Sequence, residues 1–138
     1  MAAIGNLSSA HAQAIEDLLY RSVWLLDHGQ ADRVPETLAP DGLVYGLAED
    51  PMDHARFSAW ARERAANASR KTRHLISNIR LSALPDGRVR GRSTLVVFAI
   101  DEGNAPELSF VGDQEDIFVQ AADGQWTIFE RRLVALGA

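Results

Sequence analysis

Asp27 is the first residue whose position suggests chemistry, because it follows an apolar stretch near the end of a predicted N-terminal helix. Helical spacing places Tyr20, Trp24 and Asp27 on roughly one face of that helix. Burying an ionised carboxylate without a partner is costly. A carboxylate at this position therefore finds a partner inside the protein, turns to solvent at the helix end, or caps the next turn with Asp32.

His74 opens a predicted strand, and alternation along that strand places His74, Ile76, Asn78 and Arg80 on one face. A histidine and an asparagine two positions apart on a half-apolar face indicate the polar wall of a pocket. The alternative is a histidine at the end of a strand whose ring is satisfied by backbone groups.

A meeting of Asp27 with His74 would have a clear chemical use. The carboxylate would hold the imidazole in one tautomer and raise its basicity, giving a general base near neutral pH. Such a base suits removal of a proton next to an activating group, as in dehydration, isomerisation or elimination. Tyr20 and Tyr45 are candidate phenolic donors to a carbonyl or a leaving hydroxyl. These residues predict a lyase or isomerase site that depends on tertiary contact.

Glu115 belongs to an acidic run, residues 113–116, that follows a predicted strand with arginines at alternate positions. A hairpin folded about residue 104 would set Arg92 opposite Asp116 and Ser93 opposite Glu115. Cross-strand ion pairing then accounts for the charges. The functional alternative is that Glu115 faces the cavity and binds substrate.

The remaining histidines, His11, His28 and His54, are isolated, and the chain has no cysteine. None of them forms a two-histidine or histidine–carboxylate spacing typical of a metal site. The sequence also lacks the glycine-rich nucleotide-binding motifs and the nucleophile elbow of serine hydrolases. We therefore expect neither a metal nor another cofactor.

The overall charge is acidic, with a formal net charge of −5 at pH 7. Nucleic-acid binding needs a concentrated basic face, so we expect no nucleic acid partner. No apolar stretch approaches the roughly 18 residues of a membrane span. Residues 1–5 lack a charged segment followed by a long apolar run, so we expect a cytoplasmic protein without a secretory signal and without membrane association.

The first half of the chain predicts three helices, over residues 8–28, 31–39 and 53–67. Pro40-Asp41-Gly42 indicates a turn after the second helix, and residues 43–47 form a short predicted strand. The second half predicts four strands, over residues 72–84, 89–100, 108–119 and 126–136, the first two joined by a Pro-Asp-Gly turn.

This order predicts an α+β fold in which three N-terminal helices pack in a curved, mixed or antiparallel sheet. A half-barrel of this cone-like shape leaves a central pocket suited to a small molecule. With no linker or repeat, residues 1–138 are expected to form a single domain. Both faces of residues 89–100 carry apolar side chains, so the face turned away from the helices needs a cover, and a homodimer would supply one.

The chain resembles the SnoaL-like branch of the nuclear-transport-factor-two-like superfamily. The resemblance rests on residues 20–27 with Tyr45, on 72–78, on 110–113 and on 123–132. At Asp27 and His74 it is similar to scytalone dehydratases, which implies that Asp27 orients His74 as the base. Leu26 and Ala99 stand where that family has a tyrosine and a second histidine, so a single His–Asp base is expected here.

The match to the β subunits of aromatic-ring-hydroxylating dioxygenases is better locally, and it implies a non-catalytic subunit beside a dioxygenase-type α subunit. The chain is shorter than those subunits and lacks their extended tail, which favours a stand-alone protein. The leading hypothesis is a lyase or isomerase acting on a small apolar, aromatic or polycyclic molecule. A module that binds such a ligand without turnover is the third hypothesis.

Overall fold

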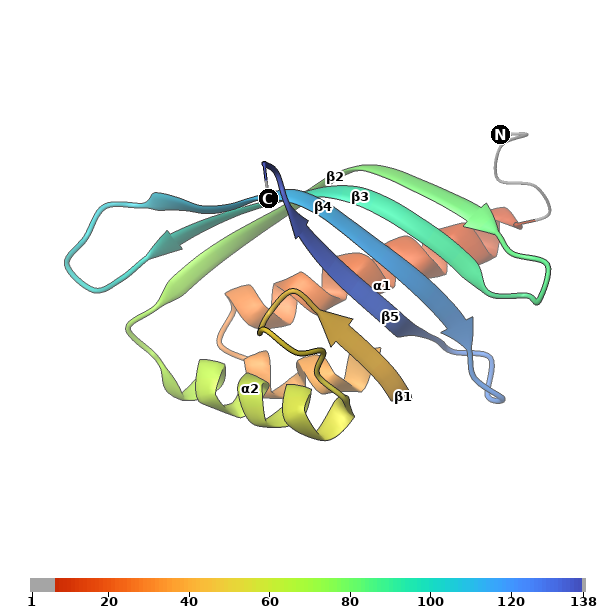
Figure 1. Cartoon of the computed structure of the whole chain (residues 1–138), viewed down its shortest axis with the longest axis horizontal. Helices are drawn as coiled ribbons and strands as arrows, with labels where there is room; N and C mark the ends of the chain where they lie inside the picture. Colours follow the sequence, from red (N-terminus) through yellow and green to blue (C-terminus); the bar gives the residue numbers. More distant parts are fainter. Residues whose placement is uncertain (1–6, 138) are drawn as a thin grey trace.

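A curved sheet of five strands forms one layer of the structure, and the helices lie along its concave side (Figure 1). The computed structural model describes residues 7–137, so the expectation about a signal at residues 1–5 lies outside the described residues. The elements are α1 (Ser9–Asp27), the 3₁₀ helix η2 (Ala31–Thr37), β1 (Leu38–Tyr45), α2 (His54–Ala66), β2 (Lys71–Ala83), β3 (Val89–Ile100), β4 (Glu107–Gln120) and β5 (Trp126–Ala135).

The strands follow the order β1-β5-β4-β3-β2, in which β1 runs parallel to β5 and the other neighbours are antiparallel. The sheet does not close into a barrel. The prediction of an α+β fold, with three helices packed on a curved mixed sheet, is confirmed. No helix within residues 7–137 is long and apolar enough to cross a membrane.

Helix α1 begins where its sequence predicts. The hydroxyl of Ser8 accepts a hydrogen bond from the backbone N–H of His11 and so caps the helix. The buried stripe of α1 packs on the sheet through residues at helical spacing, among them Ile15, Leu19 and Val23. Gly29, with φ at +75°, lets the chain turn immediately after the helix. This packing fixes the direction in which the last residue, Asp27, leaves the helix.

The prediction around Pro40-Asp41-Gly42 was wrong. These residues lie inside β1, which begins at Leu38 and directly follows η2, and η2 ends at Thr37 rather than near residue 39. The pairing of β1 with β5 shifts between Leu38 and Leu43, so the turn-like residues form an irregularity in the strand. Proline is tolerated there because β1 is an edge strand, where a missing N–H interrupts no ladder on the open side.

A β-bulge in β2 overturns the predicted alternation beyond Ile76. The pairing with β3 shifts between Ser77 and Arg80, and Asn78 adopts a left-handed conformation with φ at 54°. Asparagine is among the few non-glycine residues that accept this conformation readily. The extra residue moves Ile79 and Leu81 to the inner face and leaves Asn78 exposed.

Over Arg92 and Ser93 the β3–β4 pairing lies one residue from the predicted register, and it shifts once more between Val97 and Phe98, where β4 carries an extra residue. Arg92 therefore stands opposite Glu115 rather than Asp116, and Ser93 stands opposite Gln114. A one-residue shift exchanges the faces of a strand. As a result Asp116 points toward the helices and Glu115 points away from them.

Candidate functional site

Asp27 holds His74 through both of its carboxylate oxygens. Oδ1 lies 2.5 Å from His74 Nδ1, and Oδ2 accepts the backbone N–H of His74 at 2.8 Å. The Thr72 hydroxyl donates a third hydrogen bond to Oδ1 at 2.8 Å. The Asp27 side chain is 5% exposed and that of His74 is 14% exposed. The last residue of α1 is therefore joined to the start of β2 at three points.

These hydrogen bonds determine the charge of Asp27. Burial raises the pKa of the carboxyl, but the hydrogen bonds from His74 and Thr72 and the attraction of the imidazole outweigh it, so the pKa of Asp27 lies below its ordinary value. An ionised carboxylate accepts at both oxygens, which assigns the hydrogen of the neutral imidazole to Nδ1. The lone pair of His74 is then at Nε2, on the far side of the ring from Asp27.

His74 lines a cavity of about 250 Å³ between the sheet and the helices. Most of the wall is apolar, and the polar lining comes from a small group of side chains. The apolar residues are Leu26, Leu47, Trp60, Leu95, Val97, Phe110 and Leu133; the polar ones are Arg64, Arg70, Thr72, His74 and Ser109. An apolar cleft with few polar groups and one buried histidine–carboxylate pair is typical of a small-molecule site.

Sequence reasoning did not single out Thr72, Arg64 or Arg70 as site residues. Thr72 could have been found by alternation, since it lies two residues before His74 on the same face of β2. Arg64 lies four residues after Trp60, so helical spacing puts both on one face of α2. Arg70 follows α2 in a loop, where the sequence carries no periodic signal.

Tyr20 and Tyr45 do not line this cavity. Tyr20 lies on α1 with 49% of its surface exposed. The ring of Tyr45 lies under the guanidinium of Arg132, 3.8 Å from the ring centroid, on the face of the sheet turned away from the helices. The exposed Asn78, in the bulge of β2, is likewise absent from the cavity wall.

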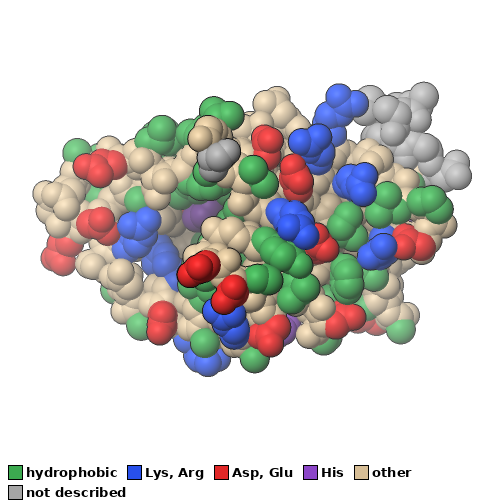
Figure 2. All heavy atoms as spheres, in the orientation of Figure 1, with side chains coloured by type: hydrophobic (Ala, Val, Ile, Leu, Met, Phe, Trp, Pro, Cys, Tyr) green, Lys and Arg blue, Asp and Glu red, His purple; other side chains and the backbone are tan. Residues whose placement is uncertain are grey.

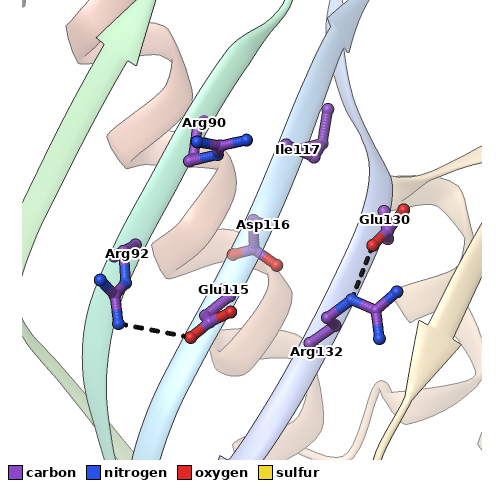
Figure 3. A pocket seen from close by; sticks show the side chains of 7 residues that line it. All are labelled: Arg90, Arg92, Glu115, Asp116, Ile117, Glu130 and Arg132. Atoms are coloured by element: carbon purple, nitrogen blue, oxygen red, sulfur yellow. Dashed lines mark hydrogen bonds and ion pairs between the residues drawn. The ribbon is translucent and has the colours of Figure 1, made fainter.

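Glu115 lies on the outer face of the sheet, where Figure 3 shows it between Arg92 and Arg132 with α1 behind the strands. Its carboxylate accepts a hydrogen bond from Arg92 at 3.4 Å. Together with Arg90 and Glu130, these residues border a hollow of about 360 Å³. Cross-strand ion pairing is present as expected, but Arg92 pairs with Glu115 in place of Asp116, and the position of Glu115 supports no role in the cavity beside His74.

Asp116, on the inner face, forms a second buried polar cluster that sequence reasoning missed. Arg131 donates two hydrogen bonds to the Asp116 carboxylate, at 2.8 and 3.2 Å, and a third to the Ser22 hydroxyl at 3.2 Å. Burial raises the pKa of Asp116, and the guanidinium of Arg131 limits the rise. The cluster ties the middle of α1 to β4 and β5, and none of its three residues lines the cavity beside His74.

Another hollow, of about 470 Å³, lies between the start of α1 and the β2–β3 turn and contains His11, whose Nδ1 accepts a hydrogen bond from the Trp126 indole. Its described lining holds no carboxylate beside that histidine. Within residues 7–137, no three His, Cys, Asp or Glu side chains gather as a group that could hold a metal ion. The cavity beside His74 is thus the candidate site, and the buried pair of His74 with Asp27 is its distinctive chemical feature.

The model of the SnoaL-like domain family matches residues 8–132. The chain belongs to the SnoaL-like domain family. The matched segment includes α1, which supplies Asp27, the strands β1 to β4 and the first seven residues of β5. No curated protein sequence matches this SnoaL-like domain significantly.

Solved structures with the same fold share little sequence with this SnoaL-like domain. ActVI-ORFA from Streptomyces coelicolor is 19% identical with a TM-score of 0.82, and the match covers 94% of this chain and all of that one. A candidate scytalone dehydratase from Novosphingobium aromaticivorans is 19% identical with a TM-score of 0.81, covering 92% and 85% of the two chains. A Catenulispora acidiphila protein in complex with S-DNPA is 18% identical with a TM-score of 0.77, covering 91% and 95%. At these identities the likeness establishes the fold.

Proposed function

We propose that this SnoaL-like domain is a cofactor-independent lyase or isomerase that removes a proton from a small apolar or aromatic molecule. His74 is the general base and Asp27 is the residue that orients it. The observation that carries the proposal is the 2.5 Å contact between Asp27 Oδ1 and His74 Nδ1 at the wall of a mostly apolar cavity. The complex of the Catenulispora acidiphila protein with S-DNPA supports a small-molecule ligand for this fold.

The proton transfer follows from the assigned tautomer. Nε2 of His74 accepts a proton from a carbon next to a carbonyl, and the electron pair of the C–H bond moves into the carbonyl as an enolate. Asp27 stabilises the imidazolium that forms. In an isomerisation the proton returns to another carbon; in a dehydration it leaves with the hydroxyl as water. Side chains such as Leu95, Val97 and Phe110 keep bulk water from the enolate.

A direct test uses β-tetralone, a bicyclic ketone with acidic C–H bonds, and follows its exchange of hydrogen for deuterium in D₂O by mass spectrometry. We expect the wild-type protein to accelerate the exchange and His74→Ala to lower the rate by about 100-fold or more. Asp27→Asn should also lower the rate, because the amide can donate to Nδ1 and stabilise the opposite tautomer.

The matched control is His28→Ala, which removes an exposed imidazole one residue beyond α1 and should leave the rate unchanged. Circular dichroism and thermal unfolding establish that each variant is folded. Exchange that is equal in the wild type and a folded His74→Ala variant would refute the role of His74 as a base. His74→Gln, which keeps a polar side chain of similar reach, gives the same comparison if the alanine variant does not fold.

We further propose that a second copy of the chain covers the outer face of the sheet. Pairing aligns apolar side chains across that face, since Leu75 stands opposite Val96 and Val96 opposite Val111. Phe98 and Val134 extend the patch and are 41% and 44% exposed. Contiguous exposed apolar surface of this kind marks an interaction site. Charged side chains of both signs lie on the same face beside the patch, which suits a self-complementary contact (Figure 3). They are Arg90, Arg92, Glu115, Glu130 and Arg132.

A further inference from the structure

Two arginines form the positively charged side of the cavity beside His74. Arg64 comes from the last turn of α2 and Arg70 from the loop that leads into β2. Both line the cavity and both are half-buried. Arg64 Nη2 donates to the Thr72 hydroxyl at 3.4 Å, and that hydroxyl donates to Asp27. One guanidinium is thus only two hydrogen bonds away from the carboxylate that holds His74.

Neither guanidinium is neutralised by its neighbours. Within residues 7–137, Arg64 forms no ion pair, and its second hydrogen bond goes to the backbone carbonyl of Asn67 at 3.5 Å. Arg70 lies 3.5 Å from a carboxylate oxygen of Asp101, whose side chain is 60% exposed, and it donates to Ser109 at 3.5 Å. Contacts this long and this exposed contribute little. Most of the ten N–H donors that two guanidinium groups carry are left for a ligand.

The two charges also repel each other. Burial lowers the pKa of Arg64, and the nearby charge of Arg70 lowers it further, while Asp27 opposes both effects. Asp27 is already engaged by three donors. Among the described residues 7–137, the only carboxylate that forms an ion pair with either arginine is that of Asp101, at 3.5 Å from Arg70. The face in Figure 2 shows the common arrangement, in which Lys and Arg are interspersed with Asp and Glu. An anion bound between the two guanidinium groups would relieve the repulsion.

We propose that Arg64 and Arg70 bind the carboxylate of an apolar or aromatic carboxylic acid, whose ring or chain fills the cavity against Trp60, Leu95 and Phe110. This proposal names the substrate class for the function proposed above and rests on the same cavity. Arginine suits the task because its planar group binds a carboxylate through two parallel hydrogen bonds. The apolar wall accepts the remainder of the molecule.

The test measures binding without turnover. Isothermal titration calorimetry compares β-naphthoate with β-naphthamide, which has nearly the same shape and no charge. We expect the wild-type protein to bind the naphthoate at least tenfold more tightly than the naphthamide. The double variant Arg64→Gln/Arg70→Gln should lose that preference while still binding the naphthamide. Added sodium chloride should weaken only the naphthoate, because screening acts on the charged pair.

The double variant Arg62→Gln/Arg80→Gln is the matched control, since it removes two guanidinium groups from exposed positions outside the cavity, and the preference should survive in it. The proposal would be overturned if the wild type bound the two probes equally tightly or showed no saturable binding of naphthoate. It would also be overturned if the folded Arg64→Gln/Arg70→Gln variant kept the preference for naphthoate. His74→Ala should keep the preference for naphthoate. Loss of catalysis and loss of anion recognition are therefore measured separately, and either proposal can fail alone.

Discussion

The carboxylate of Asp27 contacts His74 twice, at ring Nδ1 and at the backbone N–H, across a separation of 47 residues in the chain. A contact to the ring alone would let the imidazole turn about its side-chain bonds. The contact to the backbone fixes the position of the strand relative to the carboxylate as well. The orientation of the imidazole is therefore set by the packing of α1 on β2, and Thr72 supports it from the same strand.

The stability of the protein should depend on pH through Asp27. The pKa of this carboxyl is lower in the folded protein than in the unfolded chain. Its contribution is therefore fully present above the ordinary pKa of an aspartate, and it is lost as the pH falls through the lower folded value. We expect the difference in the free energy of unfolding between the wild type and Asp27→Asn to be largest at neutral pH and to shrink below about pH 4.

Urea unfolding across a pH series measures this difference. Asp116, whose pKa is raised, makes an opposite contribution to the pH dependence of the free energy of unfolding. Both proteins retain Asp116, so this contribution cancels in the difference between them. A difference that stays constant, or that grows toward acid pH, would contradict the assigned charge of Asp27.

The buried ion pair of Asp116 with Arg131 should matter far more than the exposed pair on the other face of the same sheet. Arg131→Met leaves a carboxylate that is 1% exposed without its guanidinium, which should cost about 3–5 kcal/mol in the free energy of unfolding. Arg92→Met breaks a pair in which both side chains are exposed, and the expected loss is about 0–1 kcal/mol. Chemical denaturation of the two variants decides the point, and similar losses would mean that Asp116 is not ionised in the folded protein.

The proposed homodimer should dissociate when charge is placed in the apolar patch of the outer face. Phe98→Glu introduces a carboxylate between two copies, where burying it unpaired is costly, so we expect a monomer in analytical ultracentrifugation. Tyr20→Glu is the control, because it places the same charge at an exposed aromatic residue on α1, away from the sheet. A wild-type protein that sediments as a monomer, or a Phe98→Glu variant that remains a dimer, would exclude this interface.

Local sequence was enough to predict most of the elements. Periodicity and capping locate these elements closely, because each signal depends only on residues a few positions away in the chain. Examples are the helix caps Ser8 and Asp53, the turn around Gly87 and the alternation of residues 89–100. The same local rules assigned β1 wrongly, because Pro40-Asp41-Gly42 has the composition of a turn. Its place in the structure is decided by pairing with β5, more than eighty residues later.

Two β-bulges decide which side chains of β2 and β4 face the site, and no local sequence pattern predicts where these bulges lie. One extra residue at Asn78 and another beside Phe98 exchange the faces of β2 and β4, and they carry Asn78 and Glu115 away from the cavity. Bulges arise where a curved sheet must fit its helices, so their positions follow from packing over the whole layer. Arg64 and Arg70 join the site for a similar reason, since the placement of α2 and of the loop after it brings them to the cavity beside His74.

The chemistry of Asp27 and His74 was visible in the sequence as a hypothesis, because a carboxylate at the end of an apolar helix stripe and a histidine on a strand face are both unusual. Their distance was not visible. It is set by how α1 lies across β2, which depends on apolar contacts from every layer of the fold and on hydrogen bonds from Thr72 and the His74 backbone. Residue types limit the reactions that a site can perform, but only packing brings two groups 47 residues apart to hydrogen-bonding distance.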